Sequence, residues 1–320
     1  GLMLEYPFEA LPEPGTISEV APGVHWLRMP LPMALDHINL YLLESDEGWW
    51  VVDTGMNLGP TESLWEQVFD NCLRGKPIVA VLSTHYHPDH LGMAGWLCER
   101  WRAPFYMTQG EFLSGLAFSR MRKEHFSWTS EQHLQRSGFN AEQMAAARER
   151  FGGFGPYIKP MPTAYRRLVE GESLSIDGNR WRILVGRGHS PEHACLYCDA
   201  LNVLLAGDQV IPRITSNISV MGGEPEANPL RDWFTSLERF LDILPADALV
   251  LPAHNEPFRG LHTRLRFLIE HHEEHLLALE EACSSGEPTA LELLPVMFKR
   301  ELDETQVGLA VGECIAHLNY

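Results

Sequence analysis

The stretch STHYHPDHLG, residues 83–92, holds three histidines and one aspartate within six positions. Imidazole and carboxylate groups are ligands for zinc, iron and manganese. Two histidines that stand two positions apart on a loop, His85 and His87, can reach the same ion. Asp89 and His90 follow directly and can turn toward a second ion beside the first. A loop of surface histidines is the simpler alternative, but this density of ligand residues is improbable by chance.

Three further residues that can bind a metal each follow an apolar stretch in a short loop. They are His189 in LVGRGHSPEH, Asp208 in VLLAGDQV and His254 in LVLPAHNEP. Taken singly, each is better explained as a structural histidine or as a turn aspartate. Because the same arrangement of apolar stretch, short loop and ligand residue occurs three times, a shared role in metal binding is favoured. Because two metal ions need more than four ligands, the sequence predicts a centre that holds two divalent ions.

The surrounding elements are those of an α/β protein. Short aromatic and β-branched stretches separated by turn residues predict three strands between residues 23 and 55. The continuous apolar run 77–84 predicts a strand that is buried on both faces, and helical patterns at 59–73 and 92–101 alternate with the strands. The histidine-rich loop therefore begins at the carboxyl end of a buried strand, where sheets of this class place their sites.

The ordered series H-x-H-x-D-H, G-H-S, A-G-D and P-A-H, spread over about residues 20–260, resembles the metallo-β-lactamase superfamily and its glyoxalase-II-like hydrolases. The resemblance implies a four-layer αββα sandwich with the site at one edge. It also implies two ligand sets bridged by Asp208 and a hydroxide. One set is His85, His87 and His189, and the other is Asp89, His90 and His254. Asp53 in VVDTG matches a carboxylate that supports the ligand loop.

The implied chemistry is hydrolysis. Two divalent ions about 3.5–4 Å apart give a hydroxide near neutral pH that can attack an acyl or phosphoryl centre. Asp89 would orient this nucleophile and pass a proton to the leaving group. The hydroxyl of Tyr86 could stabilise an oxyanion, although packing away from its two ligand neighbours is the simpler interpretation. His193, four residues after His189, could donate to the substrate, with a supporting or surface role as the alternative.

We expect a catalytic domain at residues 1–260 and a C-terminal module of three helices at 261–320. Within the first, residues 109–170 read as an aromatic-rich helical insertion, suited to a lid over an apolar substrate pocket or to a core or dimer contact of its own. A winged-helix-like module is one interpretation of the second, but the strands of a wing are missing. The three histidines between residues 271 and 275 are interpreted as a solvated helix face.

Composition limits the partners. The chain has 25 Lys+Arg and 43 Asp+Glu, a net charge of −18, which disfavours nucleic acid and membrane surfaces and leaves a small-molecule substrate. In residues 261–320 there are 4 lysines and arginines and 11 aspartates and glutamates, so this module is expected to support a homodimer or the lid rather than to bind DNA. The N-terminal stretch lacks the pattern of a signal peptide, and six scattered cysteines fit a reducing compartment, so we expect a cytoplasmic protein.

The sequence thus predicts a binuclear metallohydrolase, with zinc favoured over iron or manganese. The expected substrate is a thioester, ester or lactone with an apolar acyl part. A phosphodiesterase or ribonuclease is the first alternative, and a single-iron enzyme similar to persulfide dioxygenases is the second. A degenerate, non-enzymatic ligand binder is the third, which the complete ligand set argues against. Antibiotic hydrolysis is not expected, because true β-lactamases of the superfamily are usually exported and lack the carboxylate found here at Asp208.

Overall fold

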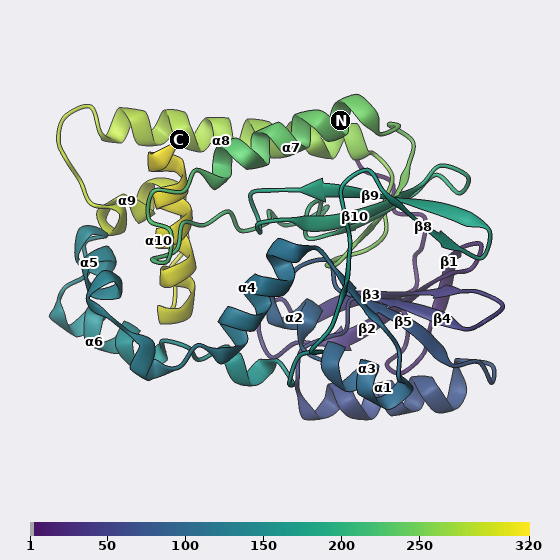
Figure 1. Ribbon diagram of the computed structural model, residues 1–320. Coiled ribbons are helices and arrows are strands. Elements are labelled where there is room, and N and C mark those ends of the chain that lie inside the picture. Colours follow the sequence, from purple (N-terminus) through teal and green to yellow (C-terminus); the bar gives the residue numbers. More distant parts are fainter. Residues whose placement is uncertain (1–2) are drawn as a thin grey trace.

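The structure is a computed structural model that describes residues 3–320, so the first two residues of the N-terminal stretch lie outside the described part. Two mixed β-sheets face each other, and helices cover the outer face of each (Figure 1). The α/β class and the αββα layering predicted from the sequence are confirmed. In the described residues, no helix is long and apolar enough to cross a membrane.

The first sheet contains seven strands that lie side by side in chain order. Its antiparallel part is β1 (Ser18–Ala21), β2 (Val24–Pro30), β3 (His37–Glu44) and β4 (Trp49–Val52). Its parallel part continues with β5 (Ile78–Leu82), β6 (Phe105–Met107) and β7 (Arg166–Arg167). The connecting helices are α1 (Gly59–Asn71), α2 (Pro88–Leu91) and α3 (Ala94–Trp101), and α1 and α3 lie beneath this sheet in Figure 1.

The second sheet has five strands in the order β12-β11-β10-β9-β8. They are β8 (Ser173–Ile176), β9 (Asn179–Gly186), β10 (His193–Cys198), β11 (Val203–Gly207) and β12 (Leu249–Pro252). Only β11 and β12 are parallel, and α7 (Pro229–Ile243) joins them across the outer face. The long helix α8 (Leu261–Ala282) packs beside α7 on the same face.

Consecutive residues of these strands enter different layers of the core. Trp26 lies between the two sheets, whereas Leu27 packs toward the helices of the first sheet. In the second sheet, Leu205 lies between the sheets and Leu204 packs toward α7 and α8. Since both faces of each central strand are buried, the strands are continuous apolar runs rather than alternating ones. This burial holds the strand ends, and therefore the loops that follow them, in fixed positions.

The predicted insertion is mostly helical, as expected, and also contains one short strand. It contains α4 (Gln109–Arg120), α5 (Trp128–Arg136), α6 (Ala141–Arg150) and the short 3₁₀ turns η1 (Lys123–His125) and η2 (Gly155–Tyr157). The last residues of the predicted segment instead form β7, which pairs in parallel with β6 and so belongs to the first sheet. The strand was not expected within this mostly helical segment, because a two-residue strand has too few positions to show a periodicity.

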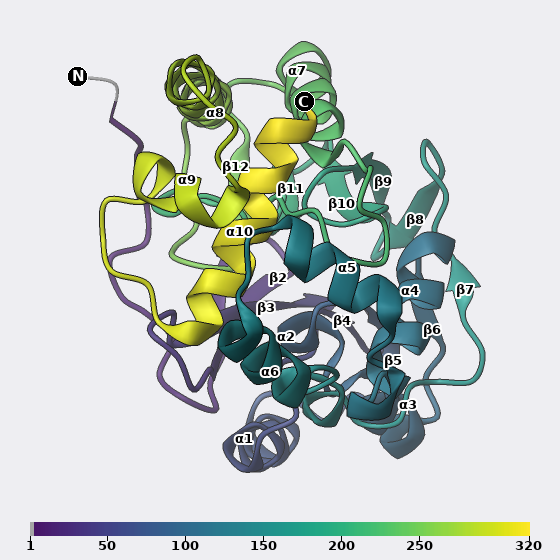
Figure 2. The ribbon, with the colours of Figure 1, turned by 90° about the vertical axis from the view of Figure 1, so that its left-hand side faces the viewer.

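The C-terminal residues form α8, α9 (Ala290–Met297) and α10 (Glu304–Asn319), and residues 261–320 contain no strand. These three helices bury a small core of their own. The insertion packs against them (Figure 2): the Leu291 backbone N–H donates to the Ser137 carbonyl at 3.0 Å, and Arg150 pairs with Glu304 at 3.1 Å. The insertion and the C-terminal helices therefore support each other.

Candidate metal centre

Five loops meet at one edge of the sandwich because the strands before them end there. Parallel pairing sets Val52 of β4 opposite Leu82 of β5, and Gly207 of β11 opposite Pro252 of β12. The two sheets are joined at this edge, where the Ala194 backbone N–H donates to the carbonyl of Thr84 at 2.8 Å. The loops that follow these strands and β9 carry the predicted site residues, namely Asp53, His85, His87, Asp89, His90, His189, Asp208 and His254.

The structure brings all seven predicted metal ligands together in two groups that share Asp208. The first group is His85, His87, His189 and Asp208, and the second is Asp89, His90, Asp208 and His254. Within each group, one candidate ligand atom from each residue lies within 4.8 Å of those of the others. This is the same division that the resemblance implied.

Asp208 lies at the middle of the cluster. Its Oδ2 is 3.2 Å from Nε2 of His85, 3.1 Å from Nε2 of His90 and 3.2 Å from Nε2 of His189. Its Oδ1 is 3.2 Å from Nε2 of His254. A single carboxylate thus faces four imidazoles through their Nε2 atoms, with one oxygen toward three of them and the other toward the fourth.

Two of these imidazoles are oriented by backbone carbonyls. Nδ1 of His189 lies 2.7 Å from the carbonyl oxygen of Asn217, and Nδ1 of His254 lies 2.9 Å from that of His37. Because a carbonyl oxygen can only accept, Nδ1 must carry the hydrogen in both rings. In the neutral form of each ring the lone pair therefore lies on Nε2, which points at Asp208.

The other two imidazoles are oriented through Asp53. Its carboxylate accepts from Nδ1 of His90 at 2.7 Å, from the backbone N–H of Thr84 at 2.8 Å and from the Thr84 hydroxyl at 3.0 Å. The same hydroxyl oxygen lies 2.9 Å from Nδ1 of His85 and can accept its hydrogen. The expectation that Asp53 supports the ligand loop is confirmed, and Thr84 extends that support to a second ligand.

The donor set fits two divalent cations. Within the described residues, Nε2 of His85, Nε2 of His189 and Oδ1 of Asp208 are buried and have no hydrogen-bond partner. Buried polar atoms are almost always paired, so three such atoms in one cluster call for a further partner. A cation bound between them supplies one, and imidazole with carboxylate is a donor set for zinc, iron or manganese.

Protonation of the metal-free cluster follows from burial and charge. Burial and the neighbouring His90 lower the pKa of His85 to about 4, so this ring is neutral at pH 7. Burial alone would also lower the pKa of His254, but Asp208 and Asp89 outweigh it and raise that pKa to about 10. The carboxylates therefore hold a proton on His254 when no metal ion is bound.

Tyr86 packs outward from the cluster. Its ring lies 4.8 Å from the ring of His87 and 5.4 Å from that of Phe118 on α4. Burial and the nearby Glu111 raise the pKa of Tyr86 to about 12, so its hydroxyl keeps its proton. This geometry favours the packing interpretation, and the oxyanion role stays a prediction.

His193 is completely buried, so the surface role considered for it is wrong. Its ring stacks 4.6 Å from that of His85, and its Nε2 accepts from the backbone N–H of Asp208 at 3.1 Å. Gly207 leaves room for this contact, since a Cβ on it would lie 2.5 Å from the His193 ring at a backbone φ of 53°. His193 thus positions Asp208 and His85, which argues against direct donation to a substrate.

Sequence reasoning missed the support that α10 gives to the ligand loop. The Ile218 backbone N–H donates to the buried carboxylate of Glu313 at 3.3 Å, and the Val220 N–H donates to the carbonyl of Gly312 at 3.0 Å. The adjacent Asn217 carbonyl orients His189, so α10 steadies a ligand from outside the sandwich. No motif signals a contact of this kind.

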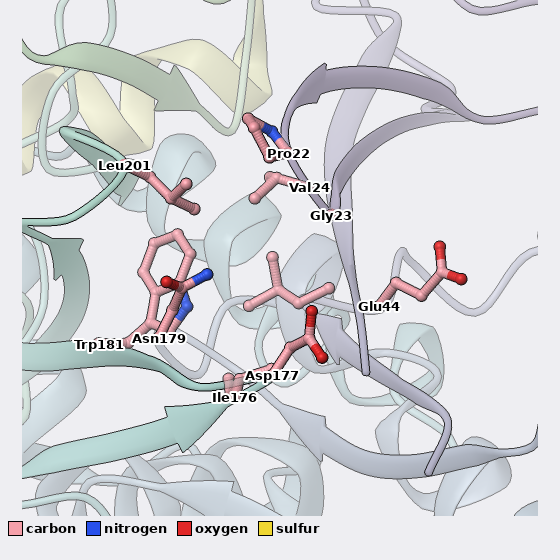
Figure 3. A pocket seen from close by; sticks show the side chains of 10 residues that line it. Pro22, Gly23, Val24, Glu44, Ile176, Asp177, Asn179, Trp181 and Leu201 are labelled. Carbon is pink, nitrogen blue, oxygen red and sulfur yellow. The ribbon is translucent and has the colours of Figure 1, made fainter. Parts of the chain in front are cut away.

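A small hollow at the opposite edge of the sandwich does not belong to the centre (Figure 3). Glu44 and Asn179 line it, and they stand at the ends of β3 and β9 that are far from the metal ligands. Its cavity volume is about 10 Å³, which is at most room for one water molecule. The hollow is too small for a substrate.

Comparison with known proteins places this arrangement in a family. A family model described as Metallo-beta-lactamase superfamily matches residues 34–254, and one described as Metallo-beta-lactamase-like, C-terminal domain, matches residues 276–320. The crystal structure of a Beta-lactamase domain protein from Burkholderia ambifaria is 42% identical, covers 99% of this chain and 91% of its own, and superimposes with a TM-score of 0.90.

Curated relatives are more distant in sequence. The probable metallo-hydrolase YqjP of Bacillus subtilis is 24% identical over 308 residues, which is 92% of this chain and 90% of that protein. The hydroxyacylglutathione hydrolase of Prochlorococcus marinus is 25% identical over 231 residues, 71% of each protein.

Proposed function

This chain belongs to the metallo-beta-lactamase superfamily, and from that premise we propose that it is a binuclear hydrolase of thioester, ester or lactone bonds in small molecules with an apolar acyl part. The observation that carries the proposal is the convergence of four imidazole Nε2 atoms on Asp208, with the Nδ1 atom of each ring already engaged. Rings held in this way are preorganised to present Nε2 to a metal ion.

The two groups that share Asp208 would hold one divalent ion each, zinc before iron or manganese. Bound ions would supply a hydroxide nucleophile near neutral pH and would polarise the substrate carbonyl. Asp53, Thr84 and the two backbone carbonyls hold the imidazoles in place. The ligands are therefore oriented when the chain folds, and they need no reorganisation during turnover.

Asp89 is the residue that would transfer a proton during the reaction. Its Oδ2 lies 3.4 Å from Nε2 of His90 and 3.3 Å from Nε2 of His254. Burial would raise the pKa of Asp89, but His90 and His254 outweigh it and hold that pKa well below its usual range. An ionised carboxylate at this position can accept the proton of the attacking hydroxide and then pass it to the leaving group.

The apolar acyl part is inferred from a row of aromatic rings that leads away from the ligands. Tyr86 packs on Phe118, whose ring lies 6.3 Å from that of Phe154, and Phe154 is 46% exposed. Apolar contact with such a row stabilises a complex by about 25 cal/mol per Å² buried, without any opposite charge. The net charge of −18 disfavours a polyanion such as RNA. The hydrolase from Prochlorococcus marinus, named for an acyl-glutathione substrate, supports an acyl bond.

A substrate panel on protein loaded separately with zinc, iron and manganese tests the proposal. We expect acyl thioesters, lactones or aryl esters to be hydrolysed with a higher kcat/KM than bis(p-nitrophenyl) phosphate or single-stranded RNA. Faster cleavage of either phosphodiester would make the enzyme a phosphodiesterase. Oxygen consumption with a persulfide and a single bound iron would make it an oxygenase.

Two variants and a matched control locate the acyl group. Phe118→Ala and Phe154→Ala should each raise KM for substrates with long or aromatic acyl parts and leave KM for acetyl substrates unchanged, because only the former reach the row. Leu277→Ala is the control, since this residue is an exposed apolar side chain on α8 (67% exposed), away from the row of aromatic rings. A change in KM for acetyl and long-chain substrates alike would contradict contact between the acyl part and this row of rings.

A further inference from the structure

A second group of histidines lies where α8 and α10 pack together. It consists of His271, His272 and His275 on α8 and His317 on α10, and we call it the α8–α10 histidine cluster. One ring nitrogen of each of the three α8 histidines lies within 4.8 Å of those of the other two. The interpretation of these residues as a solvated face was wrong for His272, which is 0% exposed and packs against Phe234 of α7.

Hydrogen bonds within the cluster leave lone pairs unused. Nδ1 of His317 lies 2.8 Å from the carbonyl oxygen of Glu313, so Nδ1 carries the hydrogen and Nε2 carries the lone pair. That Nε2 faces Nδ1 of His272 at 3.1 Å. Within the described residues, Nε2 of His272 and Nδ1 of His275 are buried without any hydrogen-bond partner. Two unpaired buried nitrogens in one cluster are unfavourable unless a further group binds them.

The spacing of the cluster suits chelation. His271 and His275 are four residues apart on one helix face, the spacing at which a helical histidine pair binds zinc, and their ring centroids are 4.4 Å apart. His317 approaches from α10, with its ring centroid 5.1 Å from that of His272 and 5.7 Å from that of His275. Its Nε2 accepts from Nδ1 of His272, which leaves Nε2 of His272 as the ligand atom of that ring. The site would therefore draw its three ligands from α8, with His317 of α10 orienting one of them.

The rings are also in the chemical form that binds metals. Burial and the neighbouring histidines lower the pKa of His272 to about 2 and that of His275 to about 4. Neutral imidazole is the ligand form, and no proton has to be displaced from these rings at neutral pH. His271 and His275 remain partly exposed, which gives an ion access from solvent.

We propose that the α8–α10 histidine cluster is a separate site for one borderline divalent transition-metal ion, with Zn²⁺ as the probe. The ion is held by the three imidazoles of α8, and the hydrogen bond between Nδ1 of His272 and Nε2 of His317 connects them to α10. Since α10 also carries Glu313, which holds the backbone N–H of Ile218, the link steadies the loop that orients His189. Its role is structural, and it does not depend on the reaction at the metal centre.

The test compares bound zinc in the full-length protein and in a variant with both His271→Ala and His275→Ala. After equilibration with Zn²⁺ and gel filtration, elemental analysis should show one ion per chain fewer in the variant, whatever the occupancy of the metal centre. His133→Ala, at a half-buried histidine of α5 outside the cluster, should lose none. Zinc should also raise the Tm of the parent protein more than that of the variant, because an ion that binds the folded chain stabilises it.

Equal zinc content in the parent and in the double variant would overturn the proposal, and so would an equal loss in His133→Ala. Should the double variant fail to fold, the single change His271→Gln keeps the side-chain bulk at a partly exposed position and removes only one ligand. It should weaken the affinity of that one ion at least about tenfold. An unchanged affinity in His271→Gln would equally refute the site.

Discussion

Asp53→Asn isolates the hydrogen-bonded support of the metal centre from the geometry of the chain. Asp53 has a backbone φ of 66°, in the left-handed region where most side chains are strained. Asparagine tolerates this region as well as aspartate does, so the substitution leaves the backbone unstrained, whereas alanine would not. What changes is the charge that accepts hydrogen bonds from His90 and from Thr84.

The expected loss is about 10–100-fold in metal affinity, or about 1.4–2.8 kcal/mol, the range found when a residue that orients a ligand is replaced. The ion held by Asp89, His90 and His254 should be weakened most, because Nδ1 of His90 donates directly to Asp53 at 2.7 Å. The other ion should be affected less, because Asp53 reaches His85 only through the hydroxyl of Thr84.

The assay is competition with a chelator, followed as each ion is removed in turn. Asp177→Asn is the matched control: Asp177 has a φ of 52° and lies in the turn between β8 and β9, far from the ligands. Two ions bound by Asp53→Asn as tightly as by the parent protein would refute the reasoning. A selective loss of the ion held by His85 would refute the assignment of Asp53 to His90.

The remaining predictions concern protons, the bridging carboxylate and α10. Since Asp208 raises the pKa of His254 to about 10, this ring is protonated below that pH and must lose its proton when a metal ion binds. Metal affinity should therefore rise between about pH 6 and 8. Calorimetric heats of metal binding that do not depend on the buffer would show that no proton is released and would contradict this prediction. Asp208→Ala should abolish turnover, whereas His193→Ala should keep measurable turnover. The His193 variant should lose about 1–3 kcal/mol of stability, because the Asp208 N–H loses its acceptor. Comparable losses of kcat in both variants would make His193 catalytic. Glu313→Ala should lower the affinity for the ion bound by His189, and Glu313→Gln should largely preserve that affinity, because glutamine keeps an acceptor for the Ile218 N–H. Equal affinities of the two variants in a chelator titration would show that α10 does not support the centre.

Much of the centre could be predicted from the sequence because its ligands follow strands that are buried on both faces. Such strands are continuous apolar runs, so the residues after Leu82, Gly207 and Pro252 stand out as polar groups at strand ends. Parallel pairing then brings those ends to one edge. The motifs predicted the order in which the ligands occur along the chain. The distances between the ligands follow from the packing of the two sheets and come from the structure.

Other features had no local signal. The carbonyls of Asn217 and His37 orient ligands from remote parts of the chain, and a backbone contact leaves no mark on residue type. Strand β7 was too short to show a pattern. The burial of His272 depends on how α7 and α10 pack against α8, which the polarity of its neighbours on α8 concealed.

The use of a main-chain carbonyl at position 217 has an evolutionary consequence. Every amino acid presents a carbonyl oxygen, so replacement of Asn217 leaves the acceptor of His189 intact as long as the loop keeps its path. Replacement by alanine removes only the hydrogen bond that Asn217 Oδ1 accepts from the Ser219 hydroxyl, so an alanine scan would not reveal that the imidazole depends on this position. Only insertions, deletions or a changed loop conformation expose the dependence. Selection on this ligand therefore acts on the length and conformation of the loop that contains Asn217 rather than on its residue types.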